Sequence, residues 1–583
     1  MLQRTFPTRE ALKRLPFGLA DVAILLGVMV LIYLVAAVGA GALVAFEPPE
    51  KLPAISLDPA NLPYYLARST LRMFVAMGFS LLFTFVVGYL AASNRYAERI
   101  IIPALDVLQS VPVLGFLSVT ITGFIALFRG SLLGLEAASI FAIFTSQVWN
   151  MTFSFYHALR NVPVDMQEAA TVYRLSRWKR FTHVQAPSGV IGLVWNMVMS
   201  FGGGWFFVAA SEAISVLNQE YTLPGIGAYV TEAVAQQNMG ALLLALAAMA
   251  ALVLALDQLL WRPLIAWADR FKIEQNESSQ APHSWVLEML RRSSMLQALR
   301  NGLSEAGERL SAQRRAARRP GRSSRRLTRP AISPRALRWF DALFNAVLLL
   351  VTLLIVGLAV WFIHTEVGFE EMLHVVWLGA LTFARVAVIV VVSTLFWTPL
   401  GVAIGMNPRV ARIAQPVTMF LVSFPANFLF PFVTIALIRL HIALDIGGIV
   451  LMALGAQWYI LFNAIAGAQS IPNDLREMAG NMRLSGWRRW QSLIMPAVFP
   501  AWVTGAITAS GGAWNASIVA EIVSWGDTTL TATGLGAYIA DATSVGDWPR
   551  IVLGVGMMSV FVVALNRLLW RRLYALAETR YRL

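Results

Sequence analysis

The sequence contains no cysteine and little charge. Of its 583 residues, 13% are Asp, Glu, Lys or Arg and 57% are hydrophobic, whereas a soluble domain carries roughly twice that charged fraction. The absence of cysteine excludes disulfides and thiol chemistry. Only four lysines occur, and none is preceded by Gly or followed by Ser or Thr. The Gly-Lys-Ser/Thr phosphate loop of many ATP-binding proteins is therefore excluded as well.

Long runs without a charged residue dominate the chain instead. They cover 22–46, 107–128, 187–211, 233–256, 342–363, 386–406, 413–438 and 446–470. A membrane-spanning helix needs about 20 apolar residues. With shorter or broken runs at 73–94, 137–156, 496–520 and 551–566, the sequence predicts an all-α polytopic membrane protein with twelve spans. The first run is longer than the core of a signal peptide, so we expect a retained helix.

Positive charge is concentrated in alternate connecting segments. Arg and Lys gather before residue 21, at 157–186, at 470–495 and after residue 570, whereas the segments around Glu212, Glu366 and Asp541 contain neither. Basic residues accumulate on the cytoplasmic side of a membrane. We therefore expect both termini in the cytoplasm.

The most basic stretch lies between the two halves of the chain. Residues 309–338 hold eleven Arg and no acid, together with Pro, Gly and Ser, a composition typical of a disordered linker. Attraction to anionic membrane lipids explains such a tract beside a membrane better than nucleic-acid binding. Upstream, residues 285–310 carry apolar side chains on one helical face, which predicts an amphipathic helix on the inner leaflet or a solvated spacer.

The two halves of the chain are repeats at a constant offset of 309 residues. Pro163 corresponds to Pro472, and the matches continue without a gap to Trp261 and Trp570. Both copies have the same charge orientation, so the repeats are parallel. This organisation predicts five regions: a cytoplasmic segment 1–20, a first repeat 21–265, a basic linker 266–338, a second repeat 339–575 and a cytoplasmic tail 576–583.

One polar segment in each repeat lies between the fourth and fifth predicted spans. Asp165 is followed three residues later by Glu168, as Asp474 is by Glu477, and this spacing has the form of a helix capping box. Two short basic helices facing the cytosol suggest a paired docking surface.

These segments resemble the EAA loop of the inner-membrane components of binding-protein-dependent ABC importers. Glu168-Ala169-Ala170 closes with Pro187, and Glu477-Met478-Ala479 closes with Pro496. The neighbouring residues are similar to the nitrate, sulfonate, taurine and bicarbonate branch, in a form with two permeases fused in one chain. The predicted docking residues are Asp165, Glu168, Ala169, Ala170, Arg174, Trp178, Asp474, Glu477, Met478, Ala479, Arg483 and Trp487.

This sequence departs from that family at one position of the loop. Arg174 and Arg483 stand where the family usually has Gly. Arg favours continued helix, so we expect the usual bend of the loop to be lost. The Arg pair could instead reach an acidic groove on the partner.

The resemblance implies a division of labour among several chains. A separate ABC ATPase dimer would bind ATP and Mg and dock on the two loops, and its closure would drive alternating access. A periplasmic or lipid-anchored binding protein would deliver substrate outside. The chain would be a multi-pass protein of a bacterial-type inner membrane, a transport subunit and not an enzyme, with no cofactor, catalytic residue or metal site of its own and no nucleic-acid partner.

Basic residues near span ends are candidates for the substrate path. Arg72 and Arg385 lie at the outer start of the second span of each repeat, and Arg129 and Arg439 lie near the outer ends of the third spans. Such side chains can snorkel to lipid headgroups. They can also form a basic funnel that concentrates an anion, and we predict a small anion or an acidic organic molecule as substrate.

Other candidates for the path lie within or beside the spans. Gly pairs beside Trp205 and Trp514 predict either close helix packing or a thin wall where the halves meet. Glu212 and Glu521, at the outer ends of the fifth spans, could be exposed to water or form hydrogen bonds in a gate. Pro112 and Pro425 fall within spans, where freed carbonyls could line a cavity.

The main alternative function is a secondary transporter of the twelve-helix, two-half type. It would need acids or His within the spans for ion coupling, and the uncharged runs provide none.

Overall fold

The computed structural model describes residues 55–109, 111–128, 131–216, 219–271, 284–293, 297 and 334–580. Its described residues divide into one unit within His283–Phe369 and a second unit within Val35–Pro282 and Glu370–Leu583. In the first unit lie α13 (Trp285–Arg292) and α15 (Pro334–Glu366). Residues 285–292 of the predicted amphipathic helix are helical, and most of the rest of 285–310 lies outside the described residues.

The described part of the first repeat lies in the second unit and contains eleven α-helices and one β-hairpin. Its elements are α2 (Leu62–Phe83), α3 (Tyr89–Ser93), α4 (Arg95–Leu108), α5 (Leu117–Leu127), α6 (Leu133–Arg160), α7 (Val164–Val172), α8 (Arg177–Arg180), α9 (Ala186–Glu212), β1 (Ala213–Val216), β2 (Gln219–Thr222), α10 (Ile226–Ala235), α11 (Met239–Leu256) and α12 (Arg262–Ala268).

The second repeat follows the same order. Its elements are α16 (Phe369–Gly405), α17 (Pro408–Ser423), α18 (Phe430–Leu440), α19 (Leu444–Gln469), α20 (Asn473–Asn481), α21 (Gly486–Arg489), α22 (Met495–Ala520), β3 (Ile522–Trp525), β4 (Thr528–Thr531), α23 (Leu535–Val545), α24 (Trp548–Leu565) and α25 (Arg571–Arg580). The helical membrane fold and its duplication are confirmed, and two small antiparallel hairpins, β1–β2 and β3–β4, are added to it.

The number of spans is confirmed only in part. Eight helices of the described residues are long and apolar enough to cross a membrane, or nine if the bent pair α17–α18 counts as one span. The remaining predicted spans include 22–46, which lies outside the described residues, and 107–128 and 137–156, which are helical but are not among the eight.

Proline interrupts the third span of each repeat. Phe424 precedes Pro425 and has an extended backbone (φ −79°, ψ 129°), because a residue before proline is disfavoured in the helical region. The chain turns by 85° between α17 and α18. In the first repeat, α4 and α5 are separated in the same way around Pro112.

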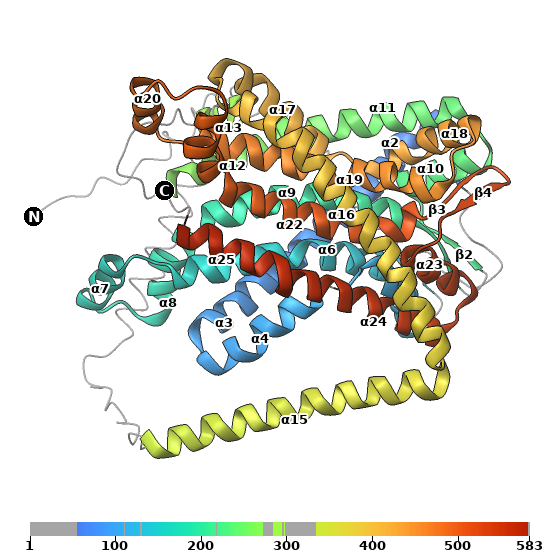
Figure 1. Ribbon diagram of the computed structural model, residues 1–583, viewed down its shortest axis with the longest axis horizontal. Helices are drawn as coiled ribbons and strands as arrows, with labels where there is room; N and C mark the ends of the chain where they lie inside the picture. Colours follow the sequence, from blue (N-terminus) through green and yellow to red (C-terminus); the bar gives the residue numbers. More distant parts are fainter. Residues whose placement is uncertain are drawn as a thin grey trace, which may run out of the picture. The chain divides into compact units, whose positions relative to one another are not determined.

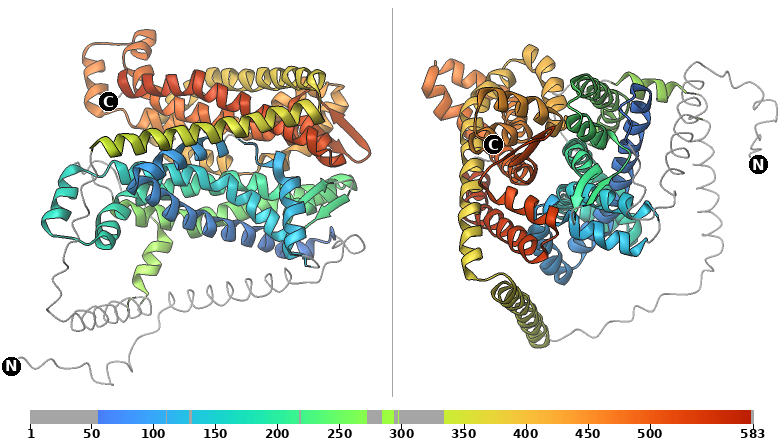
Figure 2. Two further views of the ribbon diagram at one scale, coloured as in Figure 1. Left: turned by 90° about the horizontal axis from the view of Figure 1, so that it is seen from below. Right: turned by 90° about the vertical axis from the view of Figure 1, so that its right-hand side faces the viewer.

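The docking segments and the hairpins lie at opposite ends of the helical bundle. Helices α7 and α20 project from one end, while strands β2, β3 and β4 lie at the other (Figure 1). The same separation is seen when the molecule is turned (Figure 2). The long helices of both repeats therefore connect the two ends.

The two repeats contact each other directly. Val113 N donates to Asn515 Oδ1 at 3.1 Å, and Asn427 Nδ2 donates to the Phe206 carbonyl at 3.2 Å. A Cβ on Gly202 would lie 2.8 Å from Ser423 Oγ of the other repeat. At Gly202 the structure therefore supports the packing interpretation, because glycine permits close approach at a place where the halves meet.

Candidate functional site

The docking segments are short exposed helices. Helix α7 begins after Pro163 and α20 after Pro472, and neither proline can provide a side-chain cap. Asp165 and Asp474 therefore lie in the first turn rather than at the N-cap, and the predicted capping box is wrong. An acidic side chain in the first turn still interacts favourably with the helix dipole.

The prediction of continued helix at Arg174 and Arg483 is also wrong. Both residues have left-handed backbones, with φ of 49° and 52°. Arg174 N donates to the Thr171 carbonyl and Leu175 N to the Ala170 carbonyl, both at 3.0 Å. This pair of bonds is the Schellman motif, which ends a helix and is usually made with Gly. The bend of the loop is therefore present, with arginine in the glycine position.

Tertiary packing accounts for the left-handed backbone conformation at Arg174 and Arg483. Ala170 is buried in a small cluster with Val162 and Val184, and Leu175 packs against the same cluster. The left-handed residue turns the chain so that Leu175 reaches this cluster, and its burial offsets the backbone strain. Ala479 and Leu484 repeat the arrangement in the second copy.

Glycine at these two positions should stabilise the protein. A left-handed conformation costs a non-glycine residue about 1–2 kcal/mol, partly offset by the greater entropy of glycine in the unfolded chain. We expect Arg174→Gly and Arg483→Gly each to raise the thermal unfolding temperature of the detergent-solubilised chain. Arg177→Gly is the matched control, since Arg177 lies in right-handed α8 and its loss should lower that temperature. A decrease for all three variants would contradict the argument.

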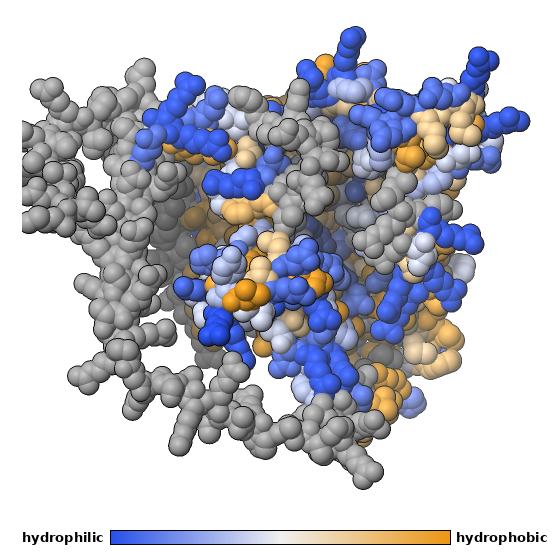
Figure 3. Space-filling model, turned by 90° about the vertical axis from the view of Figure 1, so that its left-hand side faces the viewer, coloured by the Kyte–Doolittle hydropathy of each residue, from blue (hydrophilic) through white to orange (hydrophobic). Residues whose placement is uncertain are grey.

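Apolar side chains are exposed on both docking segments. Val172 and Tyr173 are each 78% exposed, and Trp178 is 72% exposed. In the second copy Met478, Met482 and Trp487 are exposed. Figure 3 shows this end of the molecule, where apolar patches lie among many hydrophilic side chains. Such exposure of large apolar groups is typical of a protein-binding surface.

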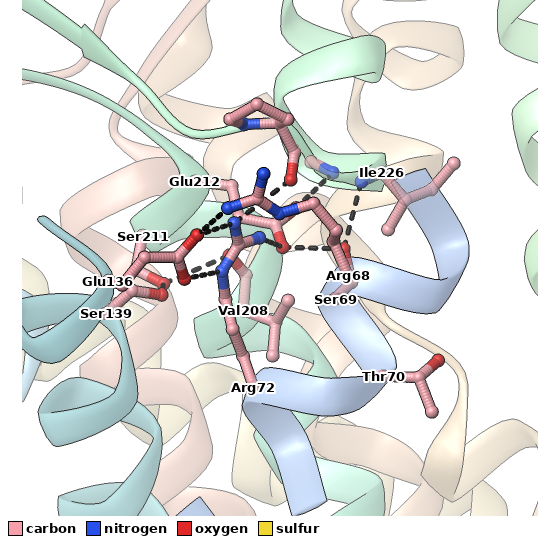
Figure 4. Close-up of polar contacts among 12 residues, drawn as sticks. Arg68, Ser69, Thr70, Arg72, Glu136, Ser139, Val208, Ser211, Glu212 and Ile226 are labelled. Atoms are coloured by element: carbon pink, nitrogen blue, oxygen red, sulfur yellow. Dashed lines mark hydrogen bonds and ion pairs between the residues drawn. The ribbon is translucent and has the colours of Figure 1, made fainter. Parts of the chain in front are cut away.

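Arg72 lies in a buried network of ion pairs rather than in a funnel. Its Nε lies 2.5 Å from Glu136 Oε2 and its Nη1 lies 2.6 Å from Glu212 Oε1. Arg68 also pairs with Glu136. The network joins α2, α6 and α9 (Figure 4). With two arginines and two glutamates, its charges balance.

Glu212 also fixes the start of the next helix. Its Oε2 accepts from Gly227 N at 2.7 Å, in the first turn of α10. A Cβ on Gly225 would lie 2.2 Å from the Glu212 carboxyl carbon, and a Cβ on Gly227 would lie 2.5 Å from the Ala209 carbonyl oxygen. The Gly-Ile-Gly element therefore allows α10 to pack directly against the end of α9.

The second repeat contains a reduced form of this network. Arg385 Nη1 lies 2.8 Å from Glu521 Oε1, and its Nη2 lies 2.7 Å from Asp445 Oδ1. Glu521 accepts from Gly536 N at 2.8 Å. Thr382 takes the place of Ser69, each donating to the glutamate of its repeat. The Asp445 side chain is 50% exposed, so this copy is open to water on one side.

These contacts correct the interpretation of several candidates for the substrate path. Arg72 and Arg385 are only 2% and 7% exposed, and Glu212 and Glu521 are fully buried. Snorkelling, a basic funnel at Arg72 and Arg385, and exposure of the glutamates to water are therefore wrong. Arg439 is exposed at the end of α18, and Arg129 lies outside the described residues.

A cavity of about 410 Å³ lies between the two repeats. Helices α6 and α9 of the first repeat and α19 and α22 of the second contribute to its wall. Trp205 and Trp514 do not line it but are buried in the protein core. The glycine pairs beside them do line it: Gly202, Gly203, Gly511 and Gly512.

The sequence predictions omitted the partners in the network and most of the cavity. Glu136 and Asp445 are related by the same offset of 309 residues, and so are Trp149 and Trp458 in the cavity wall. The repeat offset could therefore have indicated both the ion-pair network and the cavity wall. Ser69 and Thr382 likewise lie three residues before Arg72 and Arg385.

Residues 84–260 and 397–583 each match the family of binding-protein-dependent transport system inner membrane components. The chain belongs to this family. Because the family matches twice, the chain is a fused permease, and each match contains one EAA-type segment and one wall of the central cavity. It is a transport subunit.

Several import and transport permeases are similar to parts of this chain. The nitrate import permease protein NrtB of Leptolyngbya laminosa is 27% identical over 192 residues, 33% of this chain and 65% of the relative. The bicarbonate transport system permease protein CmpB of Synechococcus elongatus is 27% identical over 191 residues, 33% and 66% respectively. The osmoprotectant import permease protein OsmY of Salmonella typhimurium is 24% identical over 221 residues, 38% and 89%. The chain thus spans slightly less than two thirds of the first two relatives.

Proposed function

We propose that the fused permease forms the membrane path of an ATP-driven importer for a small anion or an acidic organic solute. The observation that carries the proposal is the pair of exposed EAA-type helices, α7 and α20, at one end of a bundle whose repeats enclose a shared cavity. Two equivalent docking sites match a dimeric partner. An ABC ATPase dimer that binds ATP and Mg would dock there, with both termini of the permease on the same, cytoplasmic side.

Transport would proceed by alternating access. ATP-driven closure of the ATPase dimer would bring α7 and α20 together, and the two repeats would rock against each other around the cavity. The buried ion-pair networks support such rigid-body movement, because each joins three long helices within one repeat. A binding protein would release substrate at the hairpin end.

The anionic substrate is supported by the names of the nitrate and bicarbonate relatives. The secondary-transporter alternative is not favoured, because the whole family is described as binding-protein-dependent. Arg72 and Arg385 do not support an anionic substrate, because both form buried ion pairs within the protein.

The composition of the complex tests this proposal. We expect one copy of this chain to assemble with two ATPase subunits, because each copy already supplies two docking helices. Native mass spectrometry of the complex purified through a tag on the permease measures the ratio. Two permease chains for each pair of ATPase subunits, or no bound ATPase, would refute the proposed assembly.

A further inference from the structure

The cavity between the repeats is lined mostly by apolar side chains, with some polar and no charged side chains among its described residues. Its described lining residues include no Asp, Glu, Lys, Arg or His. Transferring an ion from water into such a site is costly, and the cost grows with the square of the ionic charge. A doubly charged anion is therefore disfavoured much more strongly than a singly charged one.

Many polar side chains in the wall already use a donor within their own helix. Asn196 donates to the Gly192 carbonyl, Asn463 to the Tyr459 carbonyl and Thr508 to the Thr504 carbonyl, at 2.8–2.9 Å. Each of these bonds uses one side-chain donor without any ligand. They also reduce the number of donors that remain for a bound anion.

Ser200 differs from these residues. It lines the cavity and is only 4% exposed, yet its Oγ has no hydrogen-bond partner among the described residues. A buried hydroxyl without a partner is costly, and a ligand in the cavity could accept its hydrogen bond. Ser200 is therefore the best-defined candidate donor in the wall.

The aromatic lining indicates what the rest of the ligand is like. Trp149 and Phe206 come from the first repeat, and Trp458, Tyr459 and Phe424 from the second. Aromatic side chains offer large apolar surfaces to organic groups, and 410 Å³ is in the usual size range of sites for small organic molecules. A water molecule takes about 30 Å³ of liquid, so a four-atom oxyanion would leave most of the cavity filled with water.

We propose that this cavity binds an organic anion with one negative charge on an apolar body, such as a monosulfonate or monocarboxylate, in preference to a small inorganic anion. The acid group accepts a hydrogen bond from Ser200, and the apolar body packs between the aromatic side chains of the two repeats. This inference rests on the proposed function, and it names the substrate class of the same path.

Thermal unfolding of the full-length permease in detergent tests the inference, because a ligand that binds only the folded state raises the unfolding temperature. The probes are benzenesulfonate, pentanesulfonate, nitrate, bicarbonate, sulfate and glycine betaine at equal concentration and ionic strength. We expect only the two sulfonates to raise the unfolding temperature, in a concentration-dependent way.

Ser200→Ala provides the specific readout. The Ser200 hydroxyl makes no bond among the described residues, so the variant should unfold at the wild-type temperature or slightly above it without ligand. Its apparent Kd for benzenesulfonate should increase by about tenfold, as expected for loss of a hydrogen bond to a charged group. Ser188→Ala is the matched control on the same helix, since Ser188 does not line the cavity and donates to the Gln185 carbonyl.

Three results would overturn the inference. They are an equal or larger shift with nitrate, bicarbonate or sulfate, a shift with glycine betaine that Ser200→Ala removes, and no shift with either sulfonate. None of them affects the expected ratio of permease to ATPase. Conversely, a wrong ratio with the predicted sulfonate shift would refute the proposed assembly and leave the binding site standing.

Discussion

Replacing Glu212 by alanine should destabilise the permease by about 3–5 kcal/mol, because it leaves a buried charge without compensation. Glu136 alone would then face both Arg68 and Arg72, which lie buried at 3% and 2% exposure. The bond from Gly227 N would be lost as well. The measurement is the thermal unfolding temperature and folded yield of the detergent-solubilised chain.

The second repeat offers an internal comparison. Glu521→Ala should cost less than Glu212→Ala, because Arg385 keeps Asp445, whose side chain is half exposed and admits water. Glu168→Ala is the control for the loss of an exposed carboxylate, and surface changes of this kind usually alter stability by less than about 0.5 kcal/mol. Equal losses for Glu212→Ala and Glu168→Ala would show that the buried network does not stabilise the fold.

Reversing the charge at both docking helices should separate transport from folding. We expect Glu168→Lys combined with Glu477→Lys to abolish ATPase binding and uptake, with an unfolding temperature close to that of the wild type. Both side chains are exposed, so the fold does not depend on them. Retention of ATPase subunits by the tagged permease, together with the ATP hydrolysis rate of the complex, measures the effect.

A matched pair at the opposite end of the bundle controls for net charge. Asp527 and Asp541 are also exposed, and converting both to Lys changes the charge by the same amount. This variant should retain the ATPase. We further expect the two single variants, Glu168→Lys and Glu477→Lys, to differ in effect, because Met478 replaces alanine in one copy only. Normal ATPase retention by the double docking variant would show that α7 and α20 are not the coupling helices.

The sequence was most informative where one position determines the local structure. The sequence places Pro112 and Pro425 within the third spans, and the breaks seen there follow because proline restricts the residue before it whatever surrounds the chain. The offset of 309 residues predicted the duplication, since equivalent elements follow from equivalent sequences. Both features depend only on local geometry or internal comparison.

Tertiary packing decided the features that sequence reasoning missed. Helix propensity favoured continued helix at Arg174, but Leu175 gains burial only if the chain bends there. Arg72 and Glu212 are 140 residues apart, and nothing in either local sequence indicates that they meet. The residues of the cavity wall could not be predicted, because an uncharged run indicates a membrane-spanning helix but not which face of that helix meets the other repeat.

The two walls of the cavity have diverged although they arose from one repeated sequence. Asn150 corresponds to Tyr459 across the repeats, and Phe206 corresponds to Asn515. A permease made of two identical chains changes both walls with every mutation, so its path stays symmetric. In the fused chain a single mutation changes only one of the two cavity walls. An asymmetric solute can then have one preferred orientation in the cavity. Selectivity can also evolve in one repeat while the other repeat preserves the fold.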